Sequence, residues 1–145
     1  HRYIRRQRQM CIRDRRRAEI PAANGHGNAR SVAKLQAPLA CKGSAFGVDL
    51  MSAETATSVM TPRISGTDLV LGVPLSFGLG FGLVSELTPL SSNKNACFWG
   101  GWGGSSILVD QDARMSVAFV MNKMHDGVMG DLRSLALLQA VYKAL

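Results

Sequence analysis

The sequence is poor in residues that build disulfide frameworks, metal sites and membrane spans. It holds three cysteines, Cys11, Cys41 and Cys97, an odd number without any C-x-x-C spacing. This pattern argues against a disulfide scaffold or a zinc site and predicts free, partly buried thiols. The longest apolar run is far short of the roughly 20 residues that a transmembrane helix needs, so we expect no membrane partner.

Histidines are also scarce. His26 and His125 stand without a cysteine or glutamate at ligand spacing, and only Asp126 lies beside His125. We therefore expect both histidines at surface or turn positions. The sequence predicts neither a metal nor a cofactor.

Acidic residues are nearly absent from one end of the chain. Residues 1–17 hold eight arginines and one aspartate, a net charge of +7, whereas the remainder is neutral with nine basic and nine acidic residues. A charge run without apolar periodicity is typical of a solvated, disordered tail. The alternative is a basic arm that grips the phosphates of a nucleic acid.

A third interpretation treats the tail as foreign to the protein. Its letters "MCIRDR" are what a common sequencing-library transposon end gives when translated in one frame. On this interpretation residues 1–17 are a cloning or sequencing artefact, and the chain is truncated at its N-terminus. A truncated N-terminus could not show a signal peptide, so the compartment is left unknown, with the cytoplasm slightly favoured. We take residues 18–145 as the folded portion.

Capping residues and apolar spacing predict three helices. The first begins after Asn28 and runs to Ala40, with Val32, Leu35 and Leu39 on one stripe. A second, short helix is capped by Ser52 and closed by Pro62. The last follows Asp131 and places Leu132, Leu135, Leu138 and Tyr142 at helical spacing.

Between the helices the pattern favours strands. "SFGLGFGLV" (residues 76–84) alternates glycine with large apolar residues, which predicts one strand with a packed face and a nearly bare face that something approaches closely. Further strands are expected at Cys97–Gly101, Ser106–Val109 and Met115–Met121. Short connections predict a single antiparallel meander over residues 77–122, with the C-terminal helix across one face. The fold class is α+β, an antiparallel sheet flanked by helices.

The stretch "ACFWGGWGGSS" (residues 96–106) combines four glycines with two indoles. It could form a phosphate cradle, a packing turn with both indoles in a core, or one wall of an active site. The cradle is disfavoured, because the run leads into a strand and no helix N-terminus follows to hold an anion. On the residues alone, the packing turn and the active-site wall both stay open.

A serine with a lysine three positions later can act as a nucleophile with its own base. This spacing occurs at Ser31–Lys34 and at Ser91–Lys94. Thirteen serines and five lysines in this chain predict roughly half such a pair by chance, so the spacing alone is a weak signal, and no Tyr-x-Asn element accompanies either pair. We therefore interpret the first pair as ordinary helix residues and the second as part of a loop.

Four segments in order, "ANGHGNARSVAKLQAPLA", "LMSAETATSVMTP", "FGLGFGL" and "FWGGWGGSSILVDQDARMSVAFVMNKM", resemble the C-terminal part of serine β-lactamase-like hydrolases. This superfamily includes class C β-lactamases, DD-peptidases and related esterases. The resemblance covers about Ala18 to Leu145. It implies a partial β-lactamase/transpeptidase-like fold and an acyl-enzyme mechanism.

The resemblance also implies site residues. The family carries an N-terminal Ser-x-x-Lys, a central Tyr-x-Asn, and a strand with Lys-Thr-Gly or a variant such as Trp-Gly-Gly. Only the third matches this chain, at Trp99, Gly100 and Gly101. The next residue, Trp102, then gives its backbone N–H to the oxyanion hole, and the glycines let an acyl group lie against bare backbone.

Departures from the family pattern shape the functional hypothesis. Trp99 stands where β-lactamases place a lysine, which favours a small uncharged ester over a lactam that carries a carboxylate. The nucleophile and the tyrosine are expected upstream of Ala18. We thus expect a C-terminal fragment of a bacterial serine hydrolase that is inactive alone. In the intact enzyme the substrate is expected to be a small ester or amide. The alternative function is a non-catalytic module that binds nucleic acid through its arginine tail. If the chain is a fragment, we expect residues 18–145 alone to self-associate.

Overall fold

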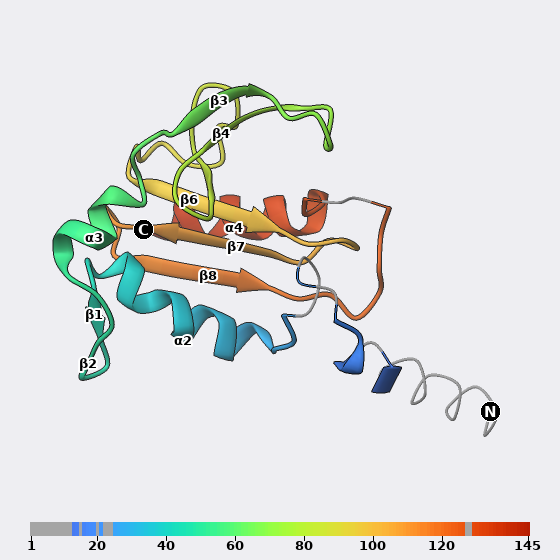
Figure 1. Cartoon of the computed structure of the whole chain (residues 1–145), viewed down its shortest axis with the longest axis horizontal. Coiled ribbons are helices and arrows are strands. Elements are labelled where there is room, and N and C mark those ends of the chain that lie inside the picture. The colour runs from blue at the N-terminus through green and yellow to red at the C-terminus, as the bar shows by residue number, and fades with distance from the viewer. Residues whose placement is uncertain (1–12, 15, 20, 22–24, 127–128) are drawn as a thin grey trace.

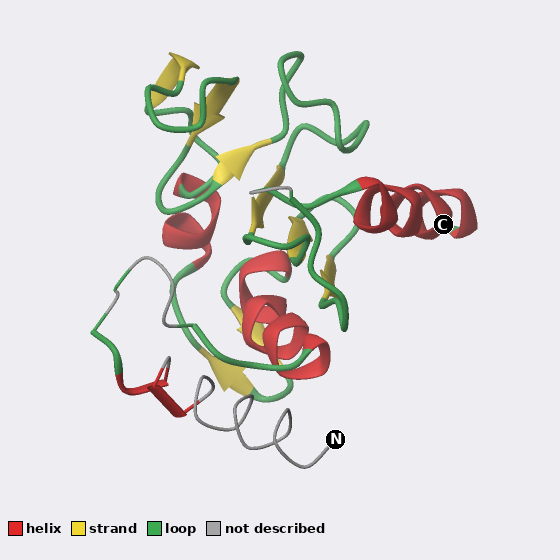
Figure 2. Cartoon of the chain, turned by 90° about the vertical axis from the view of Figure 1, so that its right-hand side faces the viewer, coloured by secondary structure: helices red, strands yellow, loops and turns green. Residues whose placement is uncertain are grey.

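The computed structural model describes residues 13–14, 16–19, 21, 25–126 and 129–145. A six-stranded sheet lies between α2 and α3 on one face and α4 on the other (Figures 1 and 2). The helices are α2 (Ala29–Ala40), α3 (Ala53–Ser58) and α4 (Leu132–Ala144). The strands are β1 (Ser44–Ala45), β2 (Val48–Asp49), β3 (Ile64–Thr67), β4 (Pro74–Phe77), β5 (Gly82–Leu83), β6 (Ala96–Gly100), β7 (Ser106–Asp110) and β8 (Met115–Phe119).

The main sheet follows the order β3-β4-β5-β6-β7-β8, and each neighbouring pair is antiparallel. Every strand therefore pairs with the strand that comes next in the sequence. This confirms the predicted meander and the α+β class. Strands β1 and β2 form a separate two-stranded hairpin beside α2 (Figure 1).

The three predicted helix starts are confirmed by their caps. The side chain of Asn28 accepts a hydrogen bond from the N–H of Ser31 at 2.9 Å, and that of Ser52 accepts one from the N–H of Thr55 at 3.1 Å. Asp131 accepts from the first turn of α4 and shares a capping box with Ser134. Each cap satisfies a backbone donor that the helix itself leaves unpaired.

Two hydrophobic cores lie on opposite faces of the sheet. Side chains alternate along β6 and β7, so Cys97 and Val109 pack under α2 and α3, whereas Phe98 and Leu108 pack under α4. Leu138 is the buried anchor of α4. Two residues of the predicted helix stripes are solvent-exposed instead: Leu35 at 67% and Leu132 at 82%. Leu132 opens the first turn of α4, and the burial of α2 is concentrated near its C-terminal end.

A buried glutamine joins the two helices on one face. The side-chain nitrogen of Gln111 donates to the carbonyl oxygens of Leu39, at 3.1 Å, and Ala56, at 2.8 Å. These carbonyls belong to α2 and α3, and Gln111 follows the last residue of β7. One amide thus fixes both helices to the end of a central strand.

The prediction of one strand across residues 76–84 was wrong. The segment is a hairpin in which β4 ends at Phe77, the N–H of Gly78 bonds to the carbonyl of Phe81, and β5 begins at Gly82. Gly80 turns the chain at φ +78°, a conformation that glycine adopts without strain. The close approach expected on the glycine face does occur at Gly82, where an added Cβ would lie 2.8 Å from the ring of Phe98.

The basic tail falls mostly outside the described residues. Within it, residues 13–14 and 16–17 are helical, and the N–H of Ala18 bonds to the carbonyl of Asp14 at 2.9 Å. The division of the chain at residue 17 stays a prediction. Among the described helices, none combines the length and the apolar character that crossing a membrane requires.

Candidate active-site edge

The predicted site residues lie together at the C-terminal end of β6. Trp99 and Gly100 close the strand, and Gly101 and Trp102 lead into the turn toward β7. The turn itself is tight: the N–H of Gly101 bonds to the carbonyl of Ser105 at 2.8 Å. No helix follows the glycines, as expected from the sequence.

The backbone of this segment has one open edge. Strand β5 pairs with β6 only at Cys97 and Phe98, while β7 accompanies β6 to Gly100. Backbone groups alternate between the two sides of a strand, and the N–H of Gly101 points toward β7. Gly100 therefore directs its N–H group to the opposite side, beyond the end of β5. Trp102 follows in the turn that the hydrogen bond from the N–H of Gly104 to the carbonyl of Gly101 closes at 3.2 Å. Among the described residues, the N–H of Trp102 has no backbone hydrogen-bond partner.

Gly100 is needed for packing on the sheet face. A Cβ at this position would lie 2.5 Å from the Cα of Met129 and 2.7 Å from the nitrogen of Gly130. No side chain fits there without displacing that backbone. The segment before α4 thus occupies the side of Gly100 on which a Cβ would stand. The expected contact of an acyl group with the bare backbone stays a prediction. What stays open is the hydrogen-bonding edge of the strand.

The turn after the motif is held from α4. The guanidinium of Arg133 donates to the carbonyl of Gly103 at 3.3 Å and to that of Lys123 at 2.9 Å. The N–H of His125 also donates to the carbonyl of Gly103, at 2.9 Å. Gly103 adopts φ +94°, so glycine is required at this position.

Asp131 completes this arrangement. Its carboxylate forms an ion pair with Arg133 and caps α4. Hydrogen bonds from the Arg133 side chain lower the pKa of Asp131 to about 2. A Cβ on Gly104 would lie 2.9 Å from the carboxyl carbon of Asp131, so the cap packs directly on the turn. The sequence pattern assigned Asp131 only as a helix cap and gave no role to Arg133, because no local pattern links residues 103 and 133.

Both indoles face solvent to a large extent. Trp99 is 43% exposed and Trp102 is 74% exposed. The ring of Phe77 lies 6.0 Å from that of Trp99, a tilted contact that supports one side of the indole. The interpretation in which both indoles fill a core was therefore wrong.

Other candidate residues lie away from this edge. Ser31 and Lys34 are on α2, which contacts β7 and β8, and the Lys34 ammonium lies over the ring of Phe46. The hydroxyl of Ser91 donates to Asp110 at 3.4 Å. The interpretation of both Ser-x-x-Lys pairs as structural agrees with these contacts.

Tyr142 is also bound to Asp110. Its hydroxyl donates to that buried carboxylate from α4, and the side chain of Asn93 donates to the same oxygen at 2.9 Å. Burial raises the pKa of Tyr142, and the bond to Asp110 raises it further. Burial alone would raise the pKa of Asp110, but hydrogen bonds from Ala113, Tyr142 and Asn93 outweigh it and lower the pKa. The pair fastens α4 to the end of β7.

The acidic, histidine and cysteine side chains of the described residues are dispersed. The described part of the chain contains no group of three or more His, Cys, Asp or Glu side chains placed to hold an ion. His125 lies in the loop that contacts Gly103, in agreement with the expected turn position.

The open β6 edge and the meander around it can be compared with known proteins. The family model described as Beta-lactamase matches residues 2–142. The chain belongs to the beta-lactamase family. Its membership confirms the resemblance seen in the sequence and relates the chain to hydrolases and esterases.

Individual relatives agree with this membership. The chain is 32% identical over 108 residues to the esterase/beta-lactamase LipL of Mycobacterium tuberculosis. This match covers 74% of this chain and 24% of LipL. A penicillin-binding protein homologue from Caulobacter crescentus matches with a TM-score of 0.84 and 36% identity, over 91% of this chain and 36% of its own. A family VIII carboxylesterase matches with a TM-score of 0.84 and 35% identity, over 92% of this chain and 36% of its own. The chain thus spans well under half the length of these relatives.

Proposed function

We propose that this chain is the C-terminal portion of a serine esterase and that it supplies the oxyanion-hole strand. The observation that carries the proposal is the edge of β6 beyond the end of β5, together with the N–H of Trp102, which has no backbone hydrogen-bond partner among the described residues. A backbone donor that is unpaired and fixed in direction suits the negative oxygen of a tetrahedral intermediate. In the proposed mechanism the N–H of Trp102 donates to that oxygen.

The nucleophile and its base are proposed to come from polypeptide outside this chain. A serine of a Ser-x-x-Lys motif attacks the ester carbonyl, the alcohol departs, and water then hydrolyses the acyl-enzyme. This chain contributes donors for the oxyanion and no nucleophile. We therefore expect no turnover of small acyl esters by the chain alone, and turnover that depended on Ser31 would overturn this assignment.

Trp99 supports an ester substrate over a charged lactam. It stands at the position where the related β-lactamases have a lysine, and its exposed, uncharged indole offers no partner for a carboxylate. The contact with Phe77 extends the apolar surface beside the edge. An uncharged acyl ester fits these surroundings, whereas an anionic lactam loses the charge-assisted bond that would hold it.

The experiment uses a longer polypeptide that carries this chain together with upstream Ser-x-x-Lys and Tyr-x-Asn motifs. We expect kcat/KM for p-nitrophenyl butyrate to exceed that for a carboxylate-bearing cephalosporin. Trp99→Lys should shift this ratio toward the cephalosporin by about tenfold, the value of one charge-assisted bond. Trp99→Gln is the uncharged control. A preference for the lactam in the unmodified protein would contradict the ester assignment.

A further inference from the structure

A second candidate site lies on the α2 side of the sheet, away from β6. It is a groove of about 690 Å³ between α2, the β1–β2 hairpin and the start of β8. Ala33 and Ala37 are spaced four residues apart on α2, so their small side chains lie on one helix face in the groove, and Cys41, the C-cap of this helix, also lines the groove. None of the lining residues belongs to the candidate active-site edge.

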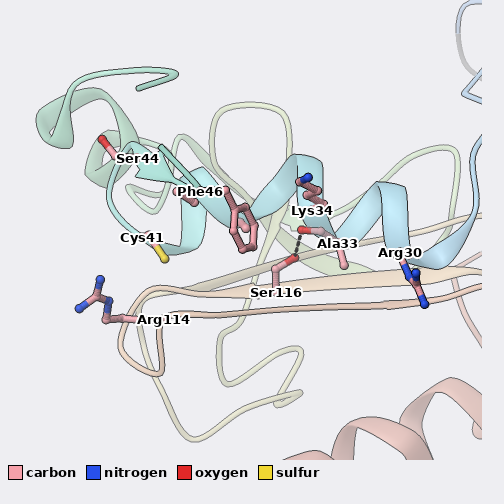
Figure 3. Close-up of a pocket in the computed structure, with 10 residues that line it drawn as sticks. Arg30, Ala33, Lys34, Cys41, Ser44, Phe46, Arg114 and Ser116 are labelled. Carbon is pink, nitrogen blue, oxygen red and sulfur yellow. Dashed lines mark hydrogen bonds between the residues drawn. The ribbon is translucent and has the colours of Figure 1, made fainter. Parts of the chain in front are cut away.

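The charges around the groove have one sign. Arg30, Lys34 and Arg114 line it, and no acidic residue does. In the described part of the chain, none of these three side chains has an ion-pair partner. Arg30 and Lys34 are like charges one helical turn apart, which is unfavourable in an unoccupied helix face. Figure 3 shows Arg30 and Arg114 toward opposite ends of the groove, with Phe46 between them.

Phe46, the aromatic residue that lines the groove, has an unfavourable backbone conformation. Phe46 is 73% exposed and has φ +53°, and the next residue, Gly47, has φ +76°. Positive φ at both central residues of a two-residue hairpin is the type I′ turn, which favours asparagine or glycine at the position of Phe46. Arg114 also has positive φ, at +50°. Strained backbone of this kind is characteristic of ligand-binding positions.

The ring and the ammonium group lie close enough to act together. The Lys34 nitrogen lies 5.5 Å from the centroid of the Phe46 ring. Ala33 and Ala37 of α2 also line the groove. The hydroxyl of Ser116, on β8, donates to the carbonyl of Ala33 at 3.0 Å and so joins the strand to the helix (Figure 3). The groove therefore offers a cation, an exposed aromatic face and a floor of small apolar side chains.

We propose that this groove binds an aromatic carboxylate. Its carboxylate pairs with Lys34, its ring stacks on Phe46, and its apolar edge lies over Ala33 and Ala37. Arg30 and Arg114 add positive potential at the two ends of the groove, which favours an anion over a neutral analogue. This site is independent of the proposed oxyanion function.

The test is equilibrium dialysis of the full chain against 2-naphthoate, with 2-naphthamide and inorganic phosphate as the two reference probes. We expect 2-naphthoate to bind more tightly than either probe by about fivefold or more, since each lacks one of the two interactions. Raising the salt concentration should weaken 2-naphthoate binding. If phosphate bound as tightly as 2-naphthoate, the groove would recognise only the negative charge. If 2-naphthamide bound as tightly as 2-naphthoate, the charge would contribute nothing to binding. Either result would overturn the proposal.

Variants separate ligand contacts from fold stability. Phe46→Asn should weaken 2-naphthoate binding about tenfold while leaving Tm unchanged or higher, because asparagine is favoured in the turn. Lys34→Gln should weaken binding about fivefold. Arg63→Gln removes a positive charge outside the groove and should change binding less than about twofold. Unchanged binding in both groove variants would overturn the proposal.

Cys41 provides an independent footprint. It is a partly buried free thiol that lines the groove, whereas burial raises the pKa of Cys97 to about 12 and keeps that thiol protonated. Bound 2-naphthoate should slow the alkylation of Cys41 by iodoacetamide, measured on the peptide by mass spectrometry. An alkylation rate unaffected by saturating 2-naphthoate would place the ligand elsewhere and overturn the proposal.

Discussion

Arg133 and Gly103 are thirty residues apart, yet the guanidinium of the first donates to the carbonyl of the second at 3.3 Å. The same guanidinium reaches the carbonyl of Lys123 at 2.9 Å and pairs with Asp131. The turn beside Trp102 is thus fixed by the first turn of α4. A backbone N–H that donates to a reacting atom benefits from such support, since a misplacement of about 1 Å can lower the reaction rate about 100-fold.

Replacing Arg133 should loosen this turn. Arg133→Met removes the bonds to both carbonyls while preserving much of the side-chain volume. We expect backbone amides of residues 101–105 to exchange hydrogen about tenfold faster, measured by mass spectrometry. Lys143→Met is the charge-matched control on the same helix, and it should leave these amides unchanged. Equal exchange in both variants would show that Arg133 does not hold the turn.

The ion pair also makes a prediction about pH. The pKa of Asp131 in the folded chain is about 2, against an ordinary value of 3.8. A lowered folded pKa gives stability that is complete above the ordinary value, declines between pH 3.8 and pH 2, and is lost below it. The stability difference between the unmodified chain and Arg133→Met should therefore be constant above about pH 5 and shrink as pH falls through this range. Urea unfolding at each pH measures it, and a difference that grows toward acid would have the wrong sign.

Gln111 is predicted to be the most sensitive polar residue of the α2–α3 core. Gln111→Ala leaves two buried carbonyl oxygens, those of Leu39 and Ala56, without this donor. We expect a loss of about 2–4 kcal/mol in the free energy of unfolding. The matched control, Gln139→Ala, changes an exposed helix residue and should cost less than about 0.5 kcal/mol. Urea unfolding at one fixed protein concentration compares them, and similar midpoints would refute the bridging role.

The outer edge of β8 predicts self-association. Within the described chain β8 is the last strand of the sheet, and its register with β7 turns the backbone groups of Ser116 and Ala118 outward. An unpaired edge of this kind is a template for another strand. We expect residues 18–145 alone to form oligomers or aggregates in size-exclusion chromatography. A monodisperse monomer with cooperative thermal unfolding would contradict this expectation.

Local signals predicted most of the fold. The caps at Asn28, Ser52 and Asp131 located the helix starts because capping depends on a few neighbouring residues. The strands around residues 97–119 were also recognisable from their apolar runs. The hairpin at Gly78–Phe81 was missed because glycines kept the period-two pattern intact through the turn. Leu132 was misassigned because spacing alone does not show which end of a helix meets the core.

The candidate site was only partly predictable. Trp99 to Trp102 were identified through a family motif, whereas the reason for Gly100 was not, since the Met129–Gly130 backbone that fills its open side is distant in sequence. The clamp between Arg133 and Gly103 and the pairing of Tyr142 with Asp110 likewise join residues about thirty positions apart. Such contacts depend on the packing of α4 on the sheet, which no local pattern encodes.

The most direct test of the central proposal removes the backbone N–H donor of Trp102. In a longer polypeptide with the upstream catalytic motifs, Trp102→Pro eliminates the backbone N–H, whereas Trp102→Phe keeps it and retains an aromatic side chain. We predict that kcat for p-nitrophenyl butyrate falls about 10²–10³-fold in the proline variant, with unchanged circular dichroism, and stays within about threefold in the phenylalanine variant. Full kcat in Trp102→Pro, or an equal loss in both variants, would contradict the assignment of Trp102 to the oxyanion hole.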